Sequence, residues 1–352
     1  MTCKIVLLPG DGIGPEVTRA AMNALKRVSD VFGITAQFET HHLGGIAIDK
    51  TGNPAPDEMI AACKKADAVF LGAVGGPKWD NAPVRPEAGL LKIRKELGLF
   101  ANLRPTVVHP SLVEQSPLRP ELVAGVDFLI VRELTGGIYF GEKTRDADKA
   151  SDLCTYSVPE IERVARVAFK AAQKRKGRLT SIDKANVLET SHLWRETVTR
   201  LGADEYPDVE LDHLLVDAAA MHLIQRPKSF DVIVTENLFG DILSDEASVL
   251  SGSIGAMGSA SLGGESPGLF EPIHGSAPDI AGMDKANPIG AIASVSMLLR
   301  HGLGLGAPAD AVDAAISQAI ESGQTTGDLG GKLSGSAAAD AIVGLIGVPV
   351  PA

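Results

Sequence analysis

The sequence predicts an α/β fold with a mainly parallel, mixed sheet, because segments with strand and helix features alternate from one end of the chain to the other. The chain has 352 residues, which is enough for about two domains with a sizeable core. Hydrophobic residues make up 45% of the sequence and charged residues 22%. This balance is typical of a globular protein.

The first predicted strand covers 4–8 and is followed by a glycine-rich turn at 10–14. Pro15 fits the first position of a helix, and Glu16 places a negative charge in its first turn. The turn has the spacing G-x-G-x-G, which differs from the dinucleotide fingerprint G-x-G-x-x-G. No acidic residue about 20 positions further on ends a second strand, as that fingerprint requires. We interpret the segment as a tight turn, with a nearby cofactor contact left open.

Further strands are predicted where short apolar runs end in polar or glycine-rich segments, at 68–71, 128–131, 180–182, 211–216 and 232–234. The segment 161–176 has helical periodicity and ends before Gly177, which suits a helix C-terminus. Gly136 and Gly137, with 138–140, predict an antiparallel excursion. The small-residue segments 251–264 and 274–282 are predicted to be binding loops.

Charge and cysteine content exclude some classes of partner. The net charge is −11 and no basic tract is present, which argues against nucleic acid and membrane surfaces as partners. Cys3, Cys63 and Cys154 form no C-x-x-C pair and are expected to be reduced thiols. The apolar run 5–8 is too short for a signal peptide, and no stretch approaches the roughly 18 apolar residues of a membrane span. We expect a cytoplasmic protein.

Two aspartates four positions apart, Asp241 and Asp245, lie in the string NLFGDILSDE at 237–246. Gly240 interrupts the apolar pattern, so we expect a helix to begin near Asp241. Residues four apart lie on one side of a helix, where like charges repel. A cation between the carboxylates would remove that repulsion, and oxygen ligands suit Mg²⁺ or Mn²⁺. The alternative, that both only complement the helix dipole, stays open.

A third acid supports the metal site. Asp217 follows the apolar run 214–216 and precedes a helix-like segment. It is therefore expected at the carboxyl end of a strand, where open α/β sheets bind their ligands.

Three arginines stand at the ends of predicted elements: Arg94, Arg104 and Arg132. Arginine is favoured where a planar carboxylate is held by two hydrogen bonds. Each alone is more often a surface or salt-bridge residue. Together with the three acids, they predict an acidic substrate bound beside a metal.

Tyr139 and Lys184 are candidate proton donors and acceptors. Tyr139 follows the turn at 136–137, and Lys184 follows the strand predicted at 180–182. A lysine near a metal can have its charged form disfavoured, which suits general acid/base work. An exposed turn lysine remains the simpler interpretation of Lys184.

The segment 271–282 is a candidate adenine-nucleotide loop. Its small residues allow backbone N–H groups to approach a ligand, and His274 could pack on a ring. Asp279 could accept hydrogen bonds from ribose hydroxyls and would repel a 2′-phosphate, which favours NAD over NADP. A loop built only for tight turning would explain the glycines but not the whole string.

Eight strings carry a family resemblance over nearly the full length: LLPGDGIGPEV at 7–17, GAVGGPKWD at 72–80, LFANLRP at 99–105, VRELTGGIYFGE at 131–142, SIDKANVL at 181–188, NLFGDILSDE at 237–246, HGSAPDIAG at 274–282 and TGDLGGK at 326–332. By these strings the chain resembles the isocitrate/isopropylmalate family of β-decarboxylating dehydrogenases. The resemblance implies a two-domain fold that is not a Rossmann fold. Residues 1–98 with 252–352 would bind the cofactor, and 99–251 would carry the metal and substrate ligands and the interface of a homodimer.

The resemblance also implies residue roles. The acid/base pair would be Tyr139 and Lys184, with Lys184 supplied by the partner subunit. The carboxylate clamp would be Arg94, Arg104 and Arg132. The metal ligands would be Asp241 and Asp245 of one subunit and Asp217 of the other, where Asp217 also contacts substrate. The NAD-binding positions would be His274, Gly275, Ser276, Ala277, Asp279 and Asn287.

The implied reaction is NAD-dependent oxidation of a hydroxy acid, assisted by Mg²⁺ or Mn²⁺, followed by loss of CO₂. Substrate choice is expected on the helix that carries Glu87, Leu90, Leu91 and Arg94. The two leucines offer apolar surface to an isopropyl group and would make burial of a third carboxylate costly. We therefore expect 3-isopropylmalate as substrate, with D-malate, tartrate or homoisocitrate as alternatives. A catalytically silent regulatory subunit is a further alternative.

Overall fold

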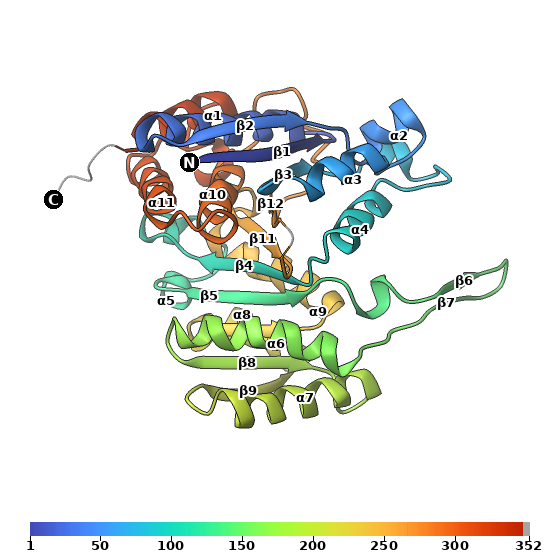
Figure 1. Cartoon of the computed structure of the whole chain (residues 1–352). Helices are drawn as coiled ribbons and strands as arrows, with labels where there is room; N and C mark the ends of the chain where they lie inside the picture. The colour runs from blue at the N-terminus through green and yellow to red at the C-terminus, as the bar shows by residue number, and fades with distance from the viewer. Residues whose placement is uncertain (266, 348–352) are drawn as a thin grey trace. The chain divides into compact units, whose positions relative to one another are not determined.

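The computed structural model describes residues 1–265 and 267–347. The chain forms two compact units, one of Met1–Leu99 with the chain from Gly252 onward and one of Phe100–Ser251. Each unit is an α/β structure whose strands are mainly parallel (Figure 1). The cofactor and substrate roles expected for the two parts remain predictions.

The first unit has strands from both ends of the chain. Their spatial order is β2 (Thr35–Thr40), β1 (Thr2–Gly10), β3 (Ala68–Ala73), β12 (Leu269–Pro272) and β11 (Gly258–Leu262). Strand β1 is parallel to β2 and β3, and β12 is parallel to β3. Only the β11–β12 pair of this unit is antiparallel among the described residues.

Helices cover both faces of these strands. The helices of the first unit are α1 (Gly14–Phe32), α2 (Gly45–Thr51), α3 (Asp57–Lys64), α4 (Glu87–Glu96), α10 (Ile289–Met297), α11 (Gly306–Glu321) and α12 (Gly335–Leu345). Val6 and Leu8 point to one face, where they share a core with residues of α3 and α4. Because side chains alternate along a strand, the residues between them face the side on which α1 packs.

The second unit has the strand order β4 (Ala101–Val107), β5 (Asp127–Glu133), β10 (Val232–Thr235), β8 (Arg178–Asp183) and β9 (Glu210–Leu215). Strands β5, β10, β8 and β9 run parallel, and β4 is antiparallel to β5. A separate hairpin of β6 (Lys143–Arg145) and β7 (Ala150–Asp152) projects from this unit (Figure 1).

The helices of the second unit are α5 (Pro120–Val123), α6 (Val158–Gln173), α7 (Glu189–Glu205), α8 (Val216–Gln225) and α9 (Asn237–Ser248). Phe128 and Ile130 of β5 share a core with α8 and α9. Helices α6 and α7 pack on the strands from the other side, since α6 contacts β5, β8 and β10 and α7 contacts β8 and β9. Phe128 and Ile130 therefore point to the face of β5 that α8 and α9 cover.

Each predicted strand falls on an observed one, and the predicted helix at 161–176 corresponds to α6. Two local predictions were wrong, and some strands were not predicted. Gly258–Leu262, inside the predicted binding loop 251–264, is a largely buried strand of small residues. The antiparallel excursion lies at 143–152, whereas 137–139 form a 3₁₀ turn. Strand β4 was not predicted, because Pro105 inside it cannot donate a ladder hydrogen bond and lowers the strand signal.

Candidate active site

The sheet register brings two arginines to the face covered by α9. Arg132 lies two residues after Ile130 on β5, so both point to the same side. In the antiparallel pair, Arg104 of β4 lies directly opposite Ile130. Opposed residues share a face, so Arg104 also points toward α9. Both guanidinium side chains are almost fully buried.

These arginines contact the aspartates of α9. Nη1 of Arg132 donates to Oδ1 of Asp241. Nη1 of Arg104 lies 3.4 Å from Oδ1 of Asp245, and its Nη2 lies 3.7 Å from Oδ1 of Asp241. Arg104 also donates to Oγ of Ser244 at 2.5 Å. The structure thus brings together four of the predicted site residues from three elements of the second unit.

Helix α9 begins earlier than the sequence predicted. Its first residue is Asn237, and Glu236 caps it by accepting the Phe239 N–H at 3.0 Å. Gly240 lies inside the first turn instead of ending the strand. A Cβ at Gly240 would lie 2.6 Å from Cγ of Arg132. The glycine therefore makes room for the arginine side chain as it crosses the helix.

Gly240→Ala is expected to weaken binding of an acidic substrate without unfolding the protein. The added methyl group must displace Arg132, whereas alanine improves helix propensity by about 1 kcal/mol relative to glycine. We expect KM for the acid to rise about 10-fold and the melting temperature to change little. Gly344→Ala is the matched control, because a Cβ at this exposed position of α12 meets nothing within 4 Å. An unchanged KM in Gly240→Ala would contradict the contact.

Tyr139 lies in the 3₁₀ turn Gly137–Tyr139 and reaches the same aspartate. Its hydroxyl donates to Oδ2 of Asp241 at 2.9 Å. Burial, followed by the charge of Asp241, raises the pKa of the phenol to about 12. The ring lies 5.8 Å from the Arg132 guanidinium, which is within the range of a cation–π contact. The phenol therefore keeps its proton near neutral pH and can act as a donor.

Lys184 and Asp217 form a separate pair. Lys184 follows β8, and its Nζ donates to Oδ1 of Asp217 at 2.9 Å. Asp217 lies in the first turn of α8, and this hydrogen bond is the main cause that lowers the pKa of its carboxyl. No group of three possible metal-binding side chains occurs within residues 1–265 and 267–347. One chain as described therefore does not bring Asp217 to Asp241 and Asp245.

Arg94 lies on α4 in the first unit, where Nη2 donates to Oε1 of Glu271 at 3.0 Å. The Arg94 side chain is buried and that of Glu271 is 13% exposed, and Nε of Arg94 has no hydrogen-bond partner among the described residues. Leu90 is half-buried and packs partly against the core, and Leu91 is also half-buried. Glu87 at the start of α4 is exposed. The structure leaves the predicted roles of these four residues as predictions.

The loop that follows β12 is held by the glycine-rich turn. The Ser276 carbonyl accepts the Ile13 N–H at 2.8 Å, and a Cβ at Gly12 would lie 2.0 Å from that oxygen. Gly12 has φ +55°, which glycine adopts without strain. Ala277 has φ +36°, which is unusual for a residue with a side chain. The turn at 10–14 thus holds the backbone of the candidate nucleotide loop at Ser276.

His274 is the most informative side chain of this loop. Nδ1 lies 2.9 Å from the Gly275 carbonyl oxygen, whereas Nε2 is buried without a hydrogen-bond partner among the described residues. Burial lowers the pKa of the imidazole, so the ring is neutral at neutral pH and Nε2 is its unpartnered nitrogen among the described residues. Gly275 and Asp279 are exposed. Asn287 is already engaged, since it donates to Asp328 at 2.9 Å and accepts the Ile289 N–H.

Several residues that hold the site were not predicted from the sequence. These are Asn102, Glu133, Tyr156, Glu236, Asn237, Ser244 and Glu271. For most of them the decisive contact joins residues at least 80 positions apart, so spacing alone gives no signal. The exception is Glu236, which stands directly before α9 at the position of an N-cap.

The arginines and the helix-borne aspartates of this α/β chain are typical of an enzyme of small carboxylic acids. The model of the isocitrate/isopropylmalate dehydrogenase family matches residues 4–342, and the chain belongs to this family. It is 58% identical to the 3-isopropylmalate dehydrogenase of Oleidesulfovibrio alaskensis, over 95% of this chain and 97% of that protein. It is also 58% identical to the enzyme of the same name from Geobacillus kaustophilus, over 93% and 90%.

Solved structures show the same fold. The crystal structure of isocitrate dehydrogenase from Methylococcus capsulatus is 34% identical and covers 98% of this chain and 99% of that chain, with a TM-score of 0.88. A β-decarboxylating dehydrogenase from Thermococcus kodakarensis is 37% identical and covers 98% and 96%, with a TM-score of 0.80. The predicted α/β fold class and the family resemblance are confirmed.

Proposed function

We propose that the protein catalyses the NAD-dependent oxidative decarboxylation of (2R,3S)-3-isopropylmalate to 4-methyl-2-oxopentanoate and CO₂, a step of leucine biosynthesis. The observation that carries this proposal is the 58% identity, over nearly the whole chain, to proteins named 3-isopropylmalate dehydrogenase. The likeness to an isocitrate dehydrogenase is more distant, at 34% identity.

Arg104 and Arg132 bind the substrate carboxylates. Both guanidinium groups are buried and already contact carboxylate oxygens of α9, so the arginines are held in place before substrate arrives. A buried arginine pairs strongly with a planar anion, because little water competes for its donors. Arg94 is proposed as a third member of this clamp, with Glu271 as its partner in the free protein.

A divalent metal ion, Mg²⁺ or Mn²⁺, fits the residues of α9. Asp241 and Asp245 lie one turn apart, and their side chains are 34% and 61% exposed, so carboxylate oxygens remain accessible. Hard oxygen ligands of this kind suit both ions. Asp217, which is 63% exposed, is the proposed third ligand from the partner subunit. A bound ion supplies Lewis-acid stabilisation of negative charge on substrate oxygens.

Lys184 and Tyr139 carry out the proton transfers. Lys184, as the neutral amine, accepts the proton of the C2 hydroxyl during oxidation, and Asp217 accepts a hydrogen bond that orients its side-chain nitrogen. Tyr139 donates its hydroxyl proton to the substrate carbon from which CO₂ has departed. Its hydroxyl suits this role because it is protonated and already directed at Asp241.

NAD is the proposed oxidant, bound by the loop that contains His274 and Ser276. The unpartnered Nε2 of His274 is a buried polar atom that a bound nucleotide would satisfy. Asp279 is exposed in the same loop and is proposed to accept hydrogen bonds from ribose hydroxyls. A carboxylate there repels a 2′-phosphate, so NAD is preferred over NADP.

Leu90 and Leu91 of α4 favour an isopropyl group over a third carboxylate. Neither leucine is fully buried, so apolar surface remains for a ligand. An ionised carboxylate placed against that surface would lose hydration without gaining a partner. Sister enzymes of D-malate, tartrate or homoisocitrate are therefore the less favoured alternative. Ile93 and Leu97 of the same helix are fully buried core residues, as expected.

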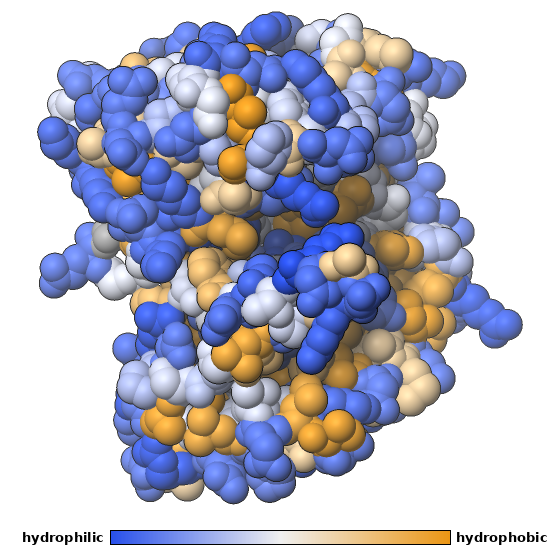
Figure 2. All heavy atoms as spheres, turned by 90° about the vertical axis from the view of Figure 1, so that its right-hand side faces the viewer, coloured by the Kyte–Doolittle hydropathy of each residue, from blue (hydrophilic) through white to orange (hydrophobic). Residues whose placement is uncertain are grey.

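A homodimer with shared active sites is proposed for the second unit. Large apolar side chains are exposed there, as Figure 2 shows for one face. They include Val187, Leu188, Met221, Ile242 and Val249, which are each at least 41% exposed. Three of these lie on or beside α8 and α9, the helices that carry Asp217, Asp241 and Asp245. Apolar surface of this kind marks a protein interface.

No helix within 1–265 and 267–347 is long and apolar enough to cross a membrane. A cytoplasmic location, and the absence of nucleic-acid and membrane partners, remain predictions. Cys3, Cys63 and Cys154 are all free thiols in the structure.

The direct test is product formation by the purified protein with 3-isopropylmalate, NAD and Mn²⁺. NADH, CO₂ and 4-methyl-2-oxopentanoate are expected in equal amounts, and NADP should support a much lower rate. Isothermal titration with NAD serves as the control for folding. A protein that binds NAD but produces no NADH would instead be the silent regulatory subunit, and equal rates with NADP would contradict the role of Asp279.

A further inference from the structure

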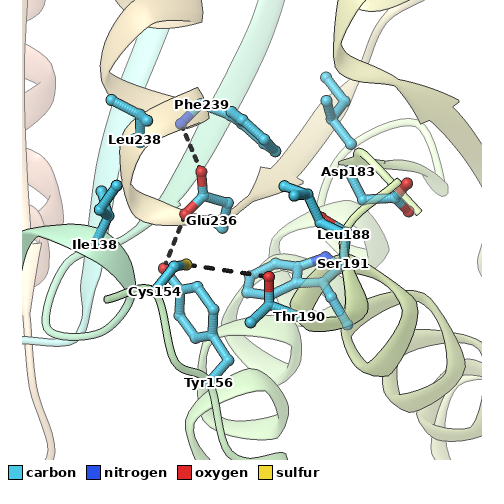
Figure 3. Close-up of a pocket in the computed structure, with 12 residues that line it drawn as sticks. Ile138, Cys154, Tyr156, Asp183, Leu188, Thr190, Ser191, Glu236, Leu238 and Phe239 are labelled. Atoms are coloured by element: carbon cyan, nitrogen blue, oxygen red, sulfur yellow. Dashed lines mark hydrogen bonds between the residues drawn. The ribbon is translucent and has the colours of Figure 1, made fainter. Parts of the chain in front are cut away.

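A buried hydrogen-bond network in the second unit lies behind the substrate-binding arginine. The Tyr156 hydroxyl lies 3.3 Å from Oε2 of Glu133 and 3.2 Å from Oε2 of Glu236. The same oxygen accepts the backbone N–H of Asn237 at 3.0 Å. Glu133 is 0% exposed and Glu236 8%. Figure 3 shows the Tyr156–Glu236 contact at the edge of a cavity.

The number of protons in this cluster decides its charge. A tyrosine hydroxyl has one proton and two lone pairs, and the Asn237 N–H takes one lone pair. If both glutamates were ionised, the hydroxyl could donate to only one of them. The other carboxylate would then face a lone pair at hydrogen-bond distance in a buried site. One additional proton on a carboxyl group removes this repulsion and satisfies every contact.

Of the two glutamates, Glu133 has the surroundings that better stabilise an ionised carboxyl group. Its oxygens accept the N–H groups of Thr135 and Gly136, both at 2.8 Å, and the Thr135 hydroxyl at 3.2 Å. Arg163 of α6 lies 3.7 Å from it. Donors and a cation around a carboxyl group favour its ionised form.

Glu236 has fewer donors. Apart from Tyr156, its carboxyl group contacts two backbone donors, the Phe239 N–H at 3.0 Å and the Leu238 N–H. Burial raises the pKa of its carboxyl, and burial also raises that of Glu133. The N-terminus of α9 and the charge of Arg132 oppose this effect at Glu236.

The cavity beside Glu236 strengthens the case for a neutral acid. It has a volume of about 160 Å³ and lies wholly within the second unit. Half of its twelve lining residues have large apolar side chains: Ile138, Ile182, Leu188, Leu238, Phe239 and Trp194. Asp183, which also lines it, is neutralised by two hydrogen bonds from Arg195 at 2.8 Å. Cys154 donates to Thr190, and both residues line the cavity (Figure 3). The cavity thus offers Glu236 no cation.

Both branches of the network converge on Asn237. Tyr156 holds its backbone N–H, and the carbonyl of Gly136, whose N–H is bound by Glu133, accepts its side-chain Nδ2 at 3.1 Å. Oδ1 of Asn237 then accepts Nε and Nη2 of Arg132 at 3.2 and 2.8 Å. The amide is therefore fixed on both sides, and it fixes the plane of the guanidinium group.

We propose that Glu236 is a neutral carboxylic acid that donates to Tyr156, that Tyr156 donates in turn to ionised Glu133, and that this chain positions Asn237 and, through it, Arg132. None of the three residues touches substrate in the proposed function, so they are positioning residues. The protonation assignment stands independently of that function, whereas the effect on Arg132 rests on it.

Infrared spectroscopy of the full-length protein at neutral pH, without substrate, tests the protonation assignment. The wild-type minus Glu236→Gln difference spectrum should contain the C=O band of a protonated carboxylic acid. Loss of carboxylate bands instead would overturn the assignment. The wild-type minus Glu133→Gln spectrum should show the opposite pattern, with loss of carboxylate bands.

Kinetics test the positioning role. Tyr156→Phe should raise KM for 3-isopropylmalate about 10-fold while kcat and KM for NAD stay within about twofold, because only the orientation of Arg132 is relaxed. Glu133→Gln should behave like Tyr156→Phe. Glu236→Gln should retain the wild-type KM, since glutamine keeps one donor for Tyr156 and one acceptor for Phe239.

A general loss of structure would lower kcat without selectively raising the KM of the acid, and that result would contradict the positioning role. A KM increase in Glu236→Gln but not in Glu133→Gln would reverse the assignment and overturn the proposal. If the wild-type protein itself does not oxidise 3-isopropylmalate, the proposed function fails, and the infrared result still decides the state of Glu236.

Discussion

Tyr139→Phe is expected to lower kcat about 10²–10⁴-fold, the usual contribution of a positioned proton donor. The change removes only the hydroxyl, which donates to Asp241 at 2.9 Å, and leaves the ring beside Arg132. Substrate binding depends on the arginines, so KM for 3-isopropylmalate should change little. Steady-state kinetics at saturating NAD and Mn²⁺ measure both constants.

Tyr206→Phe provides the matched control. Tyr206 is buried and stacks on Phe169 with ring centroids 4.7 Å apart, and it belongs to α7 and its end rather than to the site. Removal of the Tyr206 hydroxyl should leave kcat unchanged. Equal effects of Tyr139→Phe on kcat and on KM would count against a role in proton transfer.

Mixing two inactive variants, Lys184→Ala and Asp245→Asn, is expected to restore activity. Lys184 pairs with Asp217, and Asp245 pairs with Arg104, as two separate groups of the chain. If each site takes Asp245 from one subunit and Lys184 from the other, a mixed dimer has one site with both defects and one intact site. Random exchange then gives about a quarter of wild-type activity, because half of the dimers are mixed and each has one intact site.

The control mixes Lys184→Ala with Asp217→Asn. These two residues lie 2.9 Å apart and would come from the same subunit, so both sites of a mixed dimer keep one defect. No recovery is expected in this pair. If Lys184→Ala and Asp245→Asn also failed to complement after subunit exchange had been verified, Lys184 would act within its own subunit.

The strands were predictable where a short apolar run is bounded by glycine or proline, as at 4–8 before Pro9. Strand β11 was missed because its residues are small, and small residues signal a loop unless the close packing around them is known. Gly258 illustrates this, since a Cβ there would lie 2.7 Å from the Ser294 backbone nitrogen of α10. Tertiary packing, not local preference, makes this segment a strand.

The carboxylate pair of the site was predictable from the sequence, because Asp241 and Asp245 are four positions apart and share a helix face. Their partners were not, because the contacts join residues more than 100 positions apart. Gly240 shows the difference. In the sequence it resembles a helix breaker, whereas in the structure it accommodates Arg132, which comes from a strand far along the chain. The Tyr156 hydroxyl likewise contacts residues 23, 80 and 81 positions away, namely Glu133, Glu236 and Asn237.

The substrate preference decides between the proposed function and its alternatives. With purified enzyme, NAD and Mn²⁺, kcat/KM should be highest for 3-isopropylmalate among that acid, isocitrate, homoisocitrate, D-malate and tartrate. The apolar surface of Leu90 and Leu91 on α4 is the reason, because it accepts an isopropyl group and offers no partner to a third carboxylate. A higher kcat/KM for any of the other four acids would contradict the account.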